Sequence, residues 1–279
     1  MALLELKNLK TFFATKRGTV KAVNGVSYSL DAGKVLGVVG ESGSGKSVSA
    51  MSILRLLDGN GYIDSGEILF NGVDLTKLSM NEMYKIRGNE ISVIFQEPMT
   101  SLNPVFTVSR QISEPLMIHQ GMTKKQAAVK AIELLSDVKI PNPEVVAKQY
   151  PHQLSGGMRQ RAGIARTLAM NPKVILMDEP FSAVDHLTKC TLQEELINIR
   201  QAENKTVLFV THDINEAVFL ADRVVLLSPR PSTIQKIYEI PLEQKRGRND
   251  PLLLKIAAEI AKDINSGGQD IPNNYWGNL

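Results

Sequence analysis

The chain of 279 residues is 43% hydrophobic and 22% charged, which is ordinary for a globular protein, and its net charge is only +3. So small a charge argues against a nucleic-acid-binding surface, and the single cysteine, Cys190, excludes an internal disulfide framework and suits a reducing cytosol. Charges interrupt the first apolar residues, and no apolar run is long enough to span a bilayer, so neither a signal peptide nor a membrane span is predicted.

Strand and helix patterns alternate along most of the chain. Short apolar or alternating runs predict strands over 2–8, 25–30, 35–39, 67–70, 91–95, 174–177, 207–210, 224–227 and 233–240. Helical patterns occur at 48–57, 186–203, 214–221 and 251–264, and strand signals vanish between 107 and 170, where helical periodicity takes over. Strands that alternate with helices predict a parallel sheet covered on both faces.

A glycine-rich loop follows the predicted strand 35–39. Residues 40–47 read Gly-Glu-Ser-Gly-Ser-Gly-Lys-Ser and fit the phosphate-loop pattern G-x-x-x-x-G-K-[ST]. Glycines let backbone N–H groups turn toward phosphates, and the following helix offers its positive N-terminus to the same anion. Lys46 would reach the β- and γ-phosphates, and Ser47 would bind Mg²⁺. The residues expected to bind nucleotide here are Gly40, Ser42, Gly43, Ser44, Gly45, Lys46 and Ser47.

Two adjacent carboxylates, Asp178 and Glu179, end the apolar run 174–177. Open α/β sheets bind their ligands at the C-terminal ends of strands, and neighbouring strand residues point in opposite directions, so the two groups can take separate roles. Asp178 would hold Mg²⁺, and Glu179 would orient and deprotonate an attacking water. A strand that ends in Asp-Glu is weak evidence alone, but after a phosphate loop it indicates nucleotide hydrolysis.

The segment 154–161 reads Leu-Ser-Gly-Gly-Met-Arg-Gln-Arg. The Ser155 hydroxyl and the backbone of Gly156 and Gly157, at the start of a helix, would form a second anion-binding nest. The plainer alternative is an N-cap serine followed by flexible glycines that open a surface helix. With the phosphate loop and the carboxylate pair, this segment makes the chain resemble the ATP-binding subunits of ABC transporters over roughly residues 2–264.

The resemblance implies that Ser155, Gly156 and Gly157 cap the γ-phosphate of ATP bound to a partner chain. It also implies that Gln96 senses metal and water and that His212 contacts the γ-phosphate. The catalytic residues implied are therefore Glu179, His212, Gln96 and Lys46, and the metal-binding residues are Ser47, Gln96 and Asp178.

Two further assignments follow from the same resemblance. Asp185 belongs to the segment 182–185, which resembles the loop that crosses the dimer interface, although Val184 replaces the more usual leucine. Phe13 falls where the family stacks an aromatic ring on adenine, and its neighbour Phe12 is the alternative.

The fold implied is of the α/β class. It has a P-loop NTPase (RecA-like) core, an N-terminal antiparallel β subdomain and an inserted ABC-specific helical subdomain. Residues 1–265 would form the ABC ATPase domain, with 1–96 and 173–265 in the core and β subdomain and 97–172 in the helical subdomain. Residues 266–279, rich in glycine, asparagine and proline, are expected to form a flexible tail.

The function implied is that of an ATPase subunit of a prokaryotic-type importer, peripheral on the cytoplasmic face of the cell membrane, with ATP and Mg²⁺ as ligands. A second ATPase subunit, either a copy or a paralogue, would pair with it head to tail around two ATP molecules. Two membrane permease subunits and, indirectly, an extracytoplasmic solute-binding protein would complete the assembly, and no nucleic acid is expected.

Within the family the peptide and nickel type of importer is expected first, and the nitrate and sulfonate type is the alternative. Residues 96–104 resemble the dipeptide, oligopeptide and nickel importer ATPases, whereas 178–183 and 227–231 resemble the nitrate, sulfonate and taurine importer ATPases. An exporter ATPase and an ABC ATPase that acts on ribosomes or DNA are the alternatives from other classes. The resemblance further implies that the apolar loop after Gln96, with Met99, Leu102, Pro104, Val105 and Phe106, lines a groove for a permease helix; the alternative is that these side chains pack under the helical lobe.

Overall fold

The computed structural model describes residues 2–95, 102–182, 184–241 and 247–267. The chain separates into two compact units. Of the described residues, the first unit holds 31–34 and those between 77 and 209, and the second holds 2–30, 35–76, 210–241 and 247–267. Each unit combines helices with strands, in keeping with the predicted α/β class.

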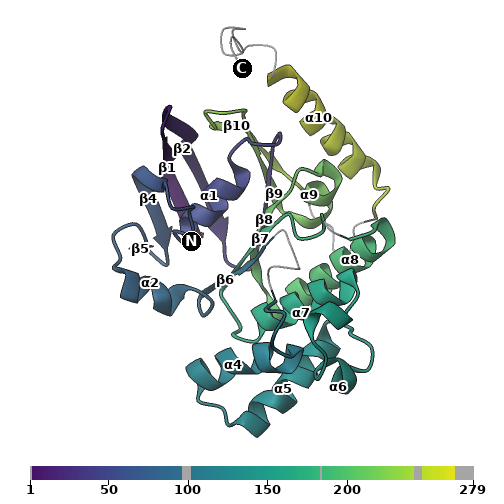
Figure 1. Cartoon of the computed structure of the whole chain (residues 1–279). Helices are drawn as coiled ribbons and strands as arrows, with labels where there is room; N and C mark the ends of the chain where they lie inside the picture. The colour runs from purple at the N-terminus through teal and green to yellow at the C-terminus, as the bar shows by residue number, and fades with distance from the viewer. Residues whose placement is uncertain (1, 96–101, 183, 242–246, 268–279) are drawn as a thin grey trace. The chain divides into compact units, whose positions relative to one another are not determined.

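An antiparallel sheet with the strand order β2-β1-β4-β5 forms one part of the second unit (Figure 1). Its strands are β1 (Ala2–Thr15), β2 (Gly18–Asp31), β4 (Gly61–Phe70) and β5 (Val73–Asp74). Leu4 of β1 lies opposite Phe70 of β4, and Phe13 lies opposite Gly61 at the other end of the pairing. Leu4, Leu6 and Leu9 are buried, so one face of this sheet forms a hydrophobic core.

Among its described residues, the second unit has three more strands and three helices. The strand order is β10-β9-β3, in which β9 (Arg223–Leu227) runs parallel to β3 (Val35–Val39) and antiparallel to β10 (Ile234–Glu239). Every residue of β3 is buried, as its uninterrupted apolar sequence predicts. The helices are α1 (Lys46–Ile53), α9 (Ile214–Leu220) and α10 (Pro251–Gly267).

The first unit has strands in the order β8-β7-β6, namely β8 (Thr206–Val210, which belongs to this unit up to Phe209), β7 (Val174–Asp178) and β6 (Ile91–Ile94). Strands β6 and β7 are parallel. The predicted helical block consists of α4 (Val108–Gln120), α5 (Lys124–Asp137), α6 (Pro143–Val146), a 3₁₀ turn (Pro151–Gln153) and α7 (Gly156–Leu168), which gather in the lower part of Figure 1. Helix α2 (Met80–Ile86) precedes the block, and α8 (His186–Glu203) follows β7.

The apolar loop that leads into α4 is only partly open to a partner. Leu102 is 1% exposed and so cannot line an open groove, and for this residue the prediction of a groove-lining role was wrong. The buried Gln111 side chain fixes the loop: it accepts from the Asn103 N–H at 2.8 Å and donates to the carbonyls of Asn103 and Phe106, each at 2.9 Å. Val105, by contrast, is 68% exposed. Met99 lies outside the described residues.

Among the helices that the structure describes, none combines the length and the apolar character needed to cross a bilayer.

Candidate nucleotide-binding site

The glycine-rich loop connects β3 to α1 in the second unit and curls around the side chain of Lys46. Lys46 is the first residue of α1 and is only 5% exposed. Its ammonium group donates to the carbonyl of Gly40 at 2.9 Å and to that of Glu41 at 2.7 Å. Both acceptors belong to the loop itself, so the positive charge is held inside the turn, where an anion bound by the loop would meet it.

Two glycines are required by the space around the loop. Gly45, the N-cap of α1, has a φ of 81°, and a Cβ built on it would lie 2.6 Å from the carbonyl oxygen of Ala22 in β2. A Cβ on Gly40 would lie 2.8 Å from the carbonyl oxygen of Leu227. Backbone atoms cannot move aside as a flexible side chain can, so any larger residue at either position would displace the loop.

The two serines of the loop suit an oxygen-rich ligand. Ser44 is 1% exposed, and its hydroxyl has no hydrogen-bond partner among the described residues. A buried hydroxyl left in this state costs about 1–3 kcal/mol, which a phosphate oxygen would offset. Ser47 lies half-buried in the first turn of α1 and offers the hard oxygen that Mg²⁺ prefers. The loop therefore fits the predicted ligands.

The structure separates the two candidate adenine-stacking residues by their exposure. Phe12 is 7% exposed, packs edge-on against Tyr62 with ring centroids 6.3 Å apart, and so belongs to the core. Phe13 points to the other face of β1, is half-buried and lies against Gly61, where an added Cβ would come within 2.8 Å of its ring. Of this pair, Phe13 has the ring surface that a base could cover.

His212 is exposed, and a buried network fixes the backbone beside it. The hydroxyl of Thr211 donates to the buried carboxylate of Glu216 at 2.6 Å and accepts from the Asp213 N–H at 3.0 Å. The Thr211 N–H also donates to the carbonyl of Val38 in β3 at 3.1 Å. The segment that carries His212 is therefore held to the strand that feeds the phosphate loop, within the same unit.

The carboxylate pair lies in the first unit, at the end of β7. Asp178 is the last residue of that strand and is 8% exposed. Glu179 has a φ of 45°, the left-handed conformation that a non-glycine residue adopts at a cost of about 1–2 kcal/mol. Such strain concentrates at functional sites.

Helix α7, which begins in the predicted second nest, is fixed to the turn after these carboxylates. Ser155 is the N-cap of α7, and its hydroxyl accepts from the Met158 N–H at 3.2 Å. The buried amide of Gln160 donates to the carbonyl of Pro180 at 2.5 Å. This bond joins the second turn of α7 to the segment that follows Glu179.

Asp185 and Gly157 meet the same helix, α8. The Asp185 carboxylate caps α8 by accepting from the Thr188 N–H at 3.1 Å, and hydrogen bonding by Thr188 holds the pKa of Asp185 below its ordinary value. A Cβ on Gly157 would lie 2.7 Å from Cγ2 of Thr188. The interface role expected for Asp185 stays a prediction beside this capping role.

The predicted site residues therefore fall into two sets. The second unit holds Phe13, Gly40, Ser42, Gly43, Ser44, Gly45, Lys46, Ser47 and His212, and the first unit holds Ser155, Gly156, Gly157, Asp178, Glu179 and Asp185. Gln96 lies outside the described residues. Sequence reasoning missed Glu216 as the support of Thr211, although a carboxylate in the first turn of the helix after His212 was a visible signal.

A phosphate loop between a buried strand and a helix, together with a second strand that ends in adjacent carboxylates, defines the class of P-loop nucleoside triphosphatases. The model of the family described as "ABC transporter" matches residues 23–182. The chain belongs to this family of ATP-binding cassettes.

Curated relatives and solved structures agree with that placement. The chain is 46% identical over 226 residues to the oligopeptide transport ATP-binding protein OppD of Bacillus subtilis and 45% identical over 225 residues to the dipeptide transport ATP-binding protein DppD of Lactococcus lactis. These matches cover 81% and 80% of this chain but only 63% and 64% of the two relatives, so the chain spans less than two thirds of their length.

The dimeric structure of MJ0796, a bacterial ABC transporter cassette, superposes with a TM-score of 0.76 at 29% identity, and it covers 86% of this chain and 100% of that one. A second structure of MJ0796, in a post-hydrolysis state bound to ADP and Pi, has a TM-score of 0.75 with the same coverage. The predicted P-loop NTPase fold is confirmed.

Proposed function

We propose that this chain is the ATP-hydrolysing, nucleotide-binding subunit of an importer for peptides. The observation that carries the proposal is the phosphate loop closed around the Lys46 ammonium, in a chain whose relatives are named oligopeptide and dipeptide transport ATP-binding proteins. The nitrate and sulfonate features of the sequence have no counterpart in those names.

Binding begins in the second unit. The N–H groups of the loop and the N-terminus of α1 bind the phosphates. The Lys46 ammonium then donates to phosphate oxygens in place of the loop carbonyls, and the ring of Phe13 stacks on the adenine. The orphaned Ser44 hydroxyl gains an acceptor. Ser47 and Asp178 would hold Mg²⁺, which neutralises charge on the phosphates when bound.

Hydrolysis requires a base and a means of sensing the γ-phosphate. Glu179 takes the proton of the attacking water while the bond from the γ-phosphorus to the bridging oxygen breaks, giving ADP and phosphate. His212 stabilises the transferred group from a backbone that Thr211 and Glu216 fix in place. Positioning and charge stabilisation supply most of the rate enhancement.

Coupling to transport requires partners. Ser155, Gly156 and Gly157 of one chain cap the ATP held by the phosphate loop of a second ATPase subunit, so ATP favours the closed pair and hydrolysis reopens it. Closure is passed to two permease subunits at the cytoplasmic face of the membrane, which receive solute from an extracytoplasmic binding protein. The exposed Val105 beside α4 is a suitable contact for a permease.

The test is capture followed by uptake. The tagged chain is purified from detergent-solubilised membranes of the cells that encode it, and its partners are identified by mass spectrometry. We expect permease subunits, and ATP-dependent uptake of labelled oligopeptides when the assembly is reconstituted into vesicles. Ribosomal proteins in place of permeases would contradict the proposal, and uptake of nitrate or sulfonate instead of peptides would contradict its substrate class.

A further inference from the structure

The turn between β9 and β10 is a closed structure that lies against the phosphate loop. Its ends are joined by the Ser228 N–H, which donates to the Thr233 carbonyl at 2.9 Å, and by the Thr233 N–H, which donates to the Ser228 hydroxyl at 3.0 Å. Ser232 is fully buried, and its carbonyl accepts from the Asn24 N–H of β2 at 2.8 Å. The turn is therefore anchored both on itself and on the neighbouring sheet.

Each of the three glycines in the phosphate loop faces this turn or the end of β9 that leads into it. A Cβ added to Gly40 would lie 2.8 Å from the Leu227 carbonyl oxygen, and one added to Gly43 would lie 3.0 Å from Nη2 of Arg230. A Cβ added to Gly45 would lie 3.3 Å from Cβ of Ser232. All of these residues belong to one compact unit. The turn and the end of β9 thus pack against the phosphate loop on the side where side chains at the three glycine positions would project.

Arg230 makes a polar contact between the β9–β10 turn and the phosphate loop. Its Nε donates to the carbonyl of Gly43, in the middle of the phosphate loop. Gly43 has a φ of 78°. Glycine adopts this conformation and several others at little cost, so the peptide groups of Gly43 can rotate unless a contact holds them. A carbonyl that turned toward bound phosphates would repel them, whereas the loop binds anions by presenting N–H groups.

We propose that Arg230 is a positioning residue of the phosphate loop. It holds the Gly43 carbonyl against the β9–β10 turn and so keeps that carbonyl away from the phosphates. The inference rests on the proposed binding of ATP. It assigns a role to a residue that lies outside the nucleotide-binding motifs and is 187 positions away from Gly43 in the chain.

The role predicts a particular pattern of affinities. Loss of the restraint should weaken every nucleotide that places a β-phosphate in the loop, so ATP and ADP should be affected by the same factor. A bond between a charged donor and a backbone carbonyl supports an effect of about tenfold in Kd. Turnover at saturating ATP should fall less than about threefold, because the loop binds substrate and transition state alike.

The experiment compares three variants by calorimetric titration of ATP and ADP, steady-state hydrolysis and thermal melting without nucleotide. Arg230→Met keeps the aliphatic stem but removes the donors, and Arg230→Lys keeps a charged donor that can reach the same carbonyl. Arg223→Met is the matched control, since the Arg223 guanidinium also donates to a backbone carbonyl of this unit, that of Ser29 at 3.1 Å, away from the phosphate loop.

We expect Arg230→Met to raise both Kd values about tenfold, Arg230→Lys to recover most of the loss, and Arg223→Met to bind as the wild type does at temperatures well below its melting point. Unchanged nucleotide binding by Arg230→Met would overturn the inference, and so would an equal loss in Arg223→Met. Failure of the wild type to bind ATP, or unaltered binding by Lys46→Ala, would instead contradict the proposed function.

Discussion

The carbonyl of Glu179 accepts two hydrogen bonds from Ser182, one from the backbone N–H at 3.2 Å and one from the hydroxyl at 2.9 Å. These bonds stabilise the left-handed backbone of Glu179 and close the turn that follows β7. Because Ser182 holds this carbonyl, the contact does not depend on the carboxylate of Glu179, and the role of the side chain can be tested with the isosteric Gln.

Replacing Glu179 with Gln should therefore abolish turnover without abolishing binding. The amide has the size of the carboxylate but cannot accept the proton of the attacking water, so we expect kcat to fall by at least about 100-fold while the Kd for ATP changes less than about threefold. Phosphate release and ATP titration measure the two quantities. Glu194→Gln, an exposed exchange of the same kind on α8, should retain wild-type turnover. Hydrolysis by Glu179→Gln within a few-fold of wild type would exclude Glu179 as the base.

Replacing Lys46 with Ala should have the opposite profile. The nearly buried ammonium supplies a charge-assisted contact to the phosphates, and its loss should raise the Kd for ATP about 10- to 100-fold. Calorimetric titration measures the change, and Lys16→Ala, at an exposed position of the β1–β2 turn, serves as the control. Comparable affinities in the two variants would show that Lys46 does not contact the nucleotide.

Motifs made of neighbouring residues were predictable because the local backbone or the ligand requires a particular residue type at each position. The phosphate loop needs glycines and a lysine at fixed spacing, and a strand that ends in Asp178 and Glu179 carries its own signal. Helix α2 also had a local sequence signal, the capping box formed by Ser79 and Glu82, but no helix was predicted there.

Longer-range features were not predictable from one sequence. Strand β1 continues through Thr15, beyond the predicted end at residue 8, because it pairs with β4, whose residues lie more than 45 positions further along the chain. The contact between Arg230 and Gly43 likewise depends on how β9 lies beside β3. Leu102 looked like a surface residue in a turn-rich loop, but it is buried, and the buried Gln111 side chain anchors the loop that follows it.

The loop before α4 now gives a sharper test of coupling. Val105→Glu should leave folding and basal hydrolysis unchanged while it weakens permease binding and peptide uptake in reconstituted vesicles, because it places a charge in an apolar contact. Leu102→Glu should instead destabilise the fold by about 3 kcal/mol or more, since its side chain is buried. Normal uptake with Val105→Glu would place the permease contact elsewhere.

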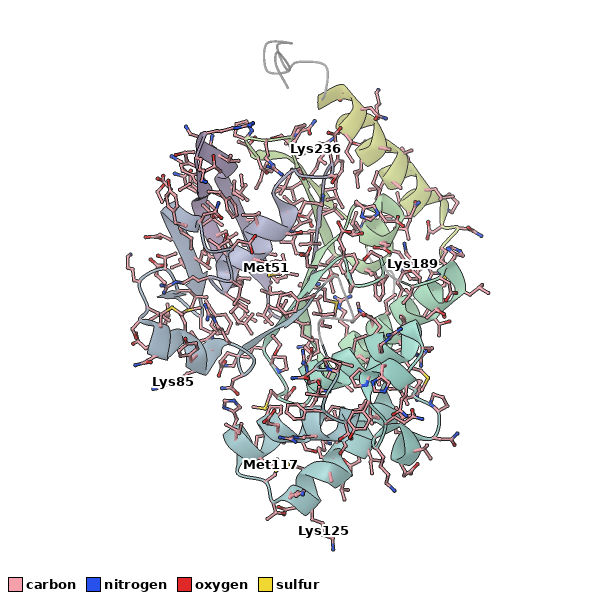
Figure 2. The ribbon with its side chains drawn as sticks, in the orientation of Figure 1. Met51, Lys85, Met117, Lys125, Lys189 and Lys236 are labelled. Carbon is pink, nitrogen blue, oxygen red and sulfur yellow. The ribbon has the colours of Figure 1, made fainter. Side chains whose placement is uncertain are left out.

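The C-terminal helix α10 should respond to acid through Asp263. Its carboxylate accepts from the Tyr238 hydroxyl at 2.5 Å and from the ammonium of Lys236, labelled in Figure 2, at 2.9 Å. The Tyr238 hydrogen bond first, and then Lys236, lower the pKa of Asp263. A lowered pKa stabilises the folded state above the ordinary carboxyl range, and this stability is lost as the pH falls through the folded-state value.

Asp263→Asn should therefore melt below the wild type at about pH 6, and the difference should shrink toward zero as the pH falls below about 3.9. Melting curves of both proteins across this range measure it, with Asp58→Asn, an exposed position in the second unit, as the control. A difference in melting temperature that does not change with pH would show that the carboxylate charge is not what anchors α10 to β10.

Composite sites predict that two inactive variants restore each other. If each site joins the phosphate loop of one chain to the Ser155–Gly157 nest of its partner, a dimer of Lys46→Ala with Ser155→Arg has both lesions in one site and an intact second site. Mixing should therefore recover up to about half of the wild-type activity per mixed dimer, provided that one intact site hydrolyses ATP alone.

Ser155→Arg also removes the N-cap of α7, so its melting temperature is measured first to establish that it folds. Chain exchange is followed by energy transfer between labelled subunits. Proven exchange without recovery of phosphate release would contradict independent composite sites, and activity of Ser155→Arg alone would show that Ser155 does not face the γ-phosphate of a partner.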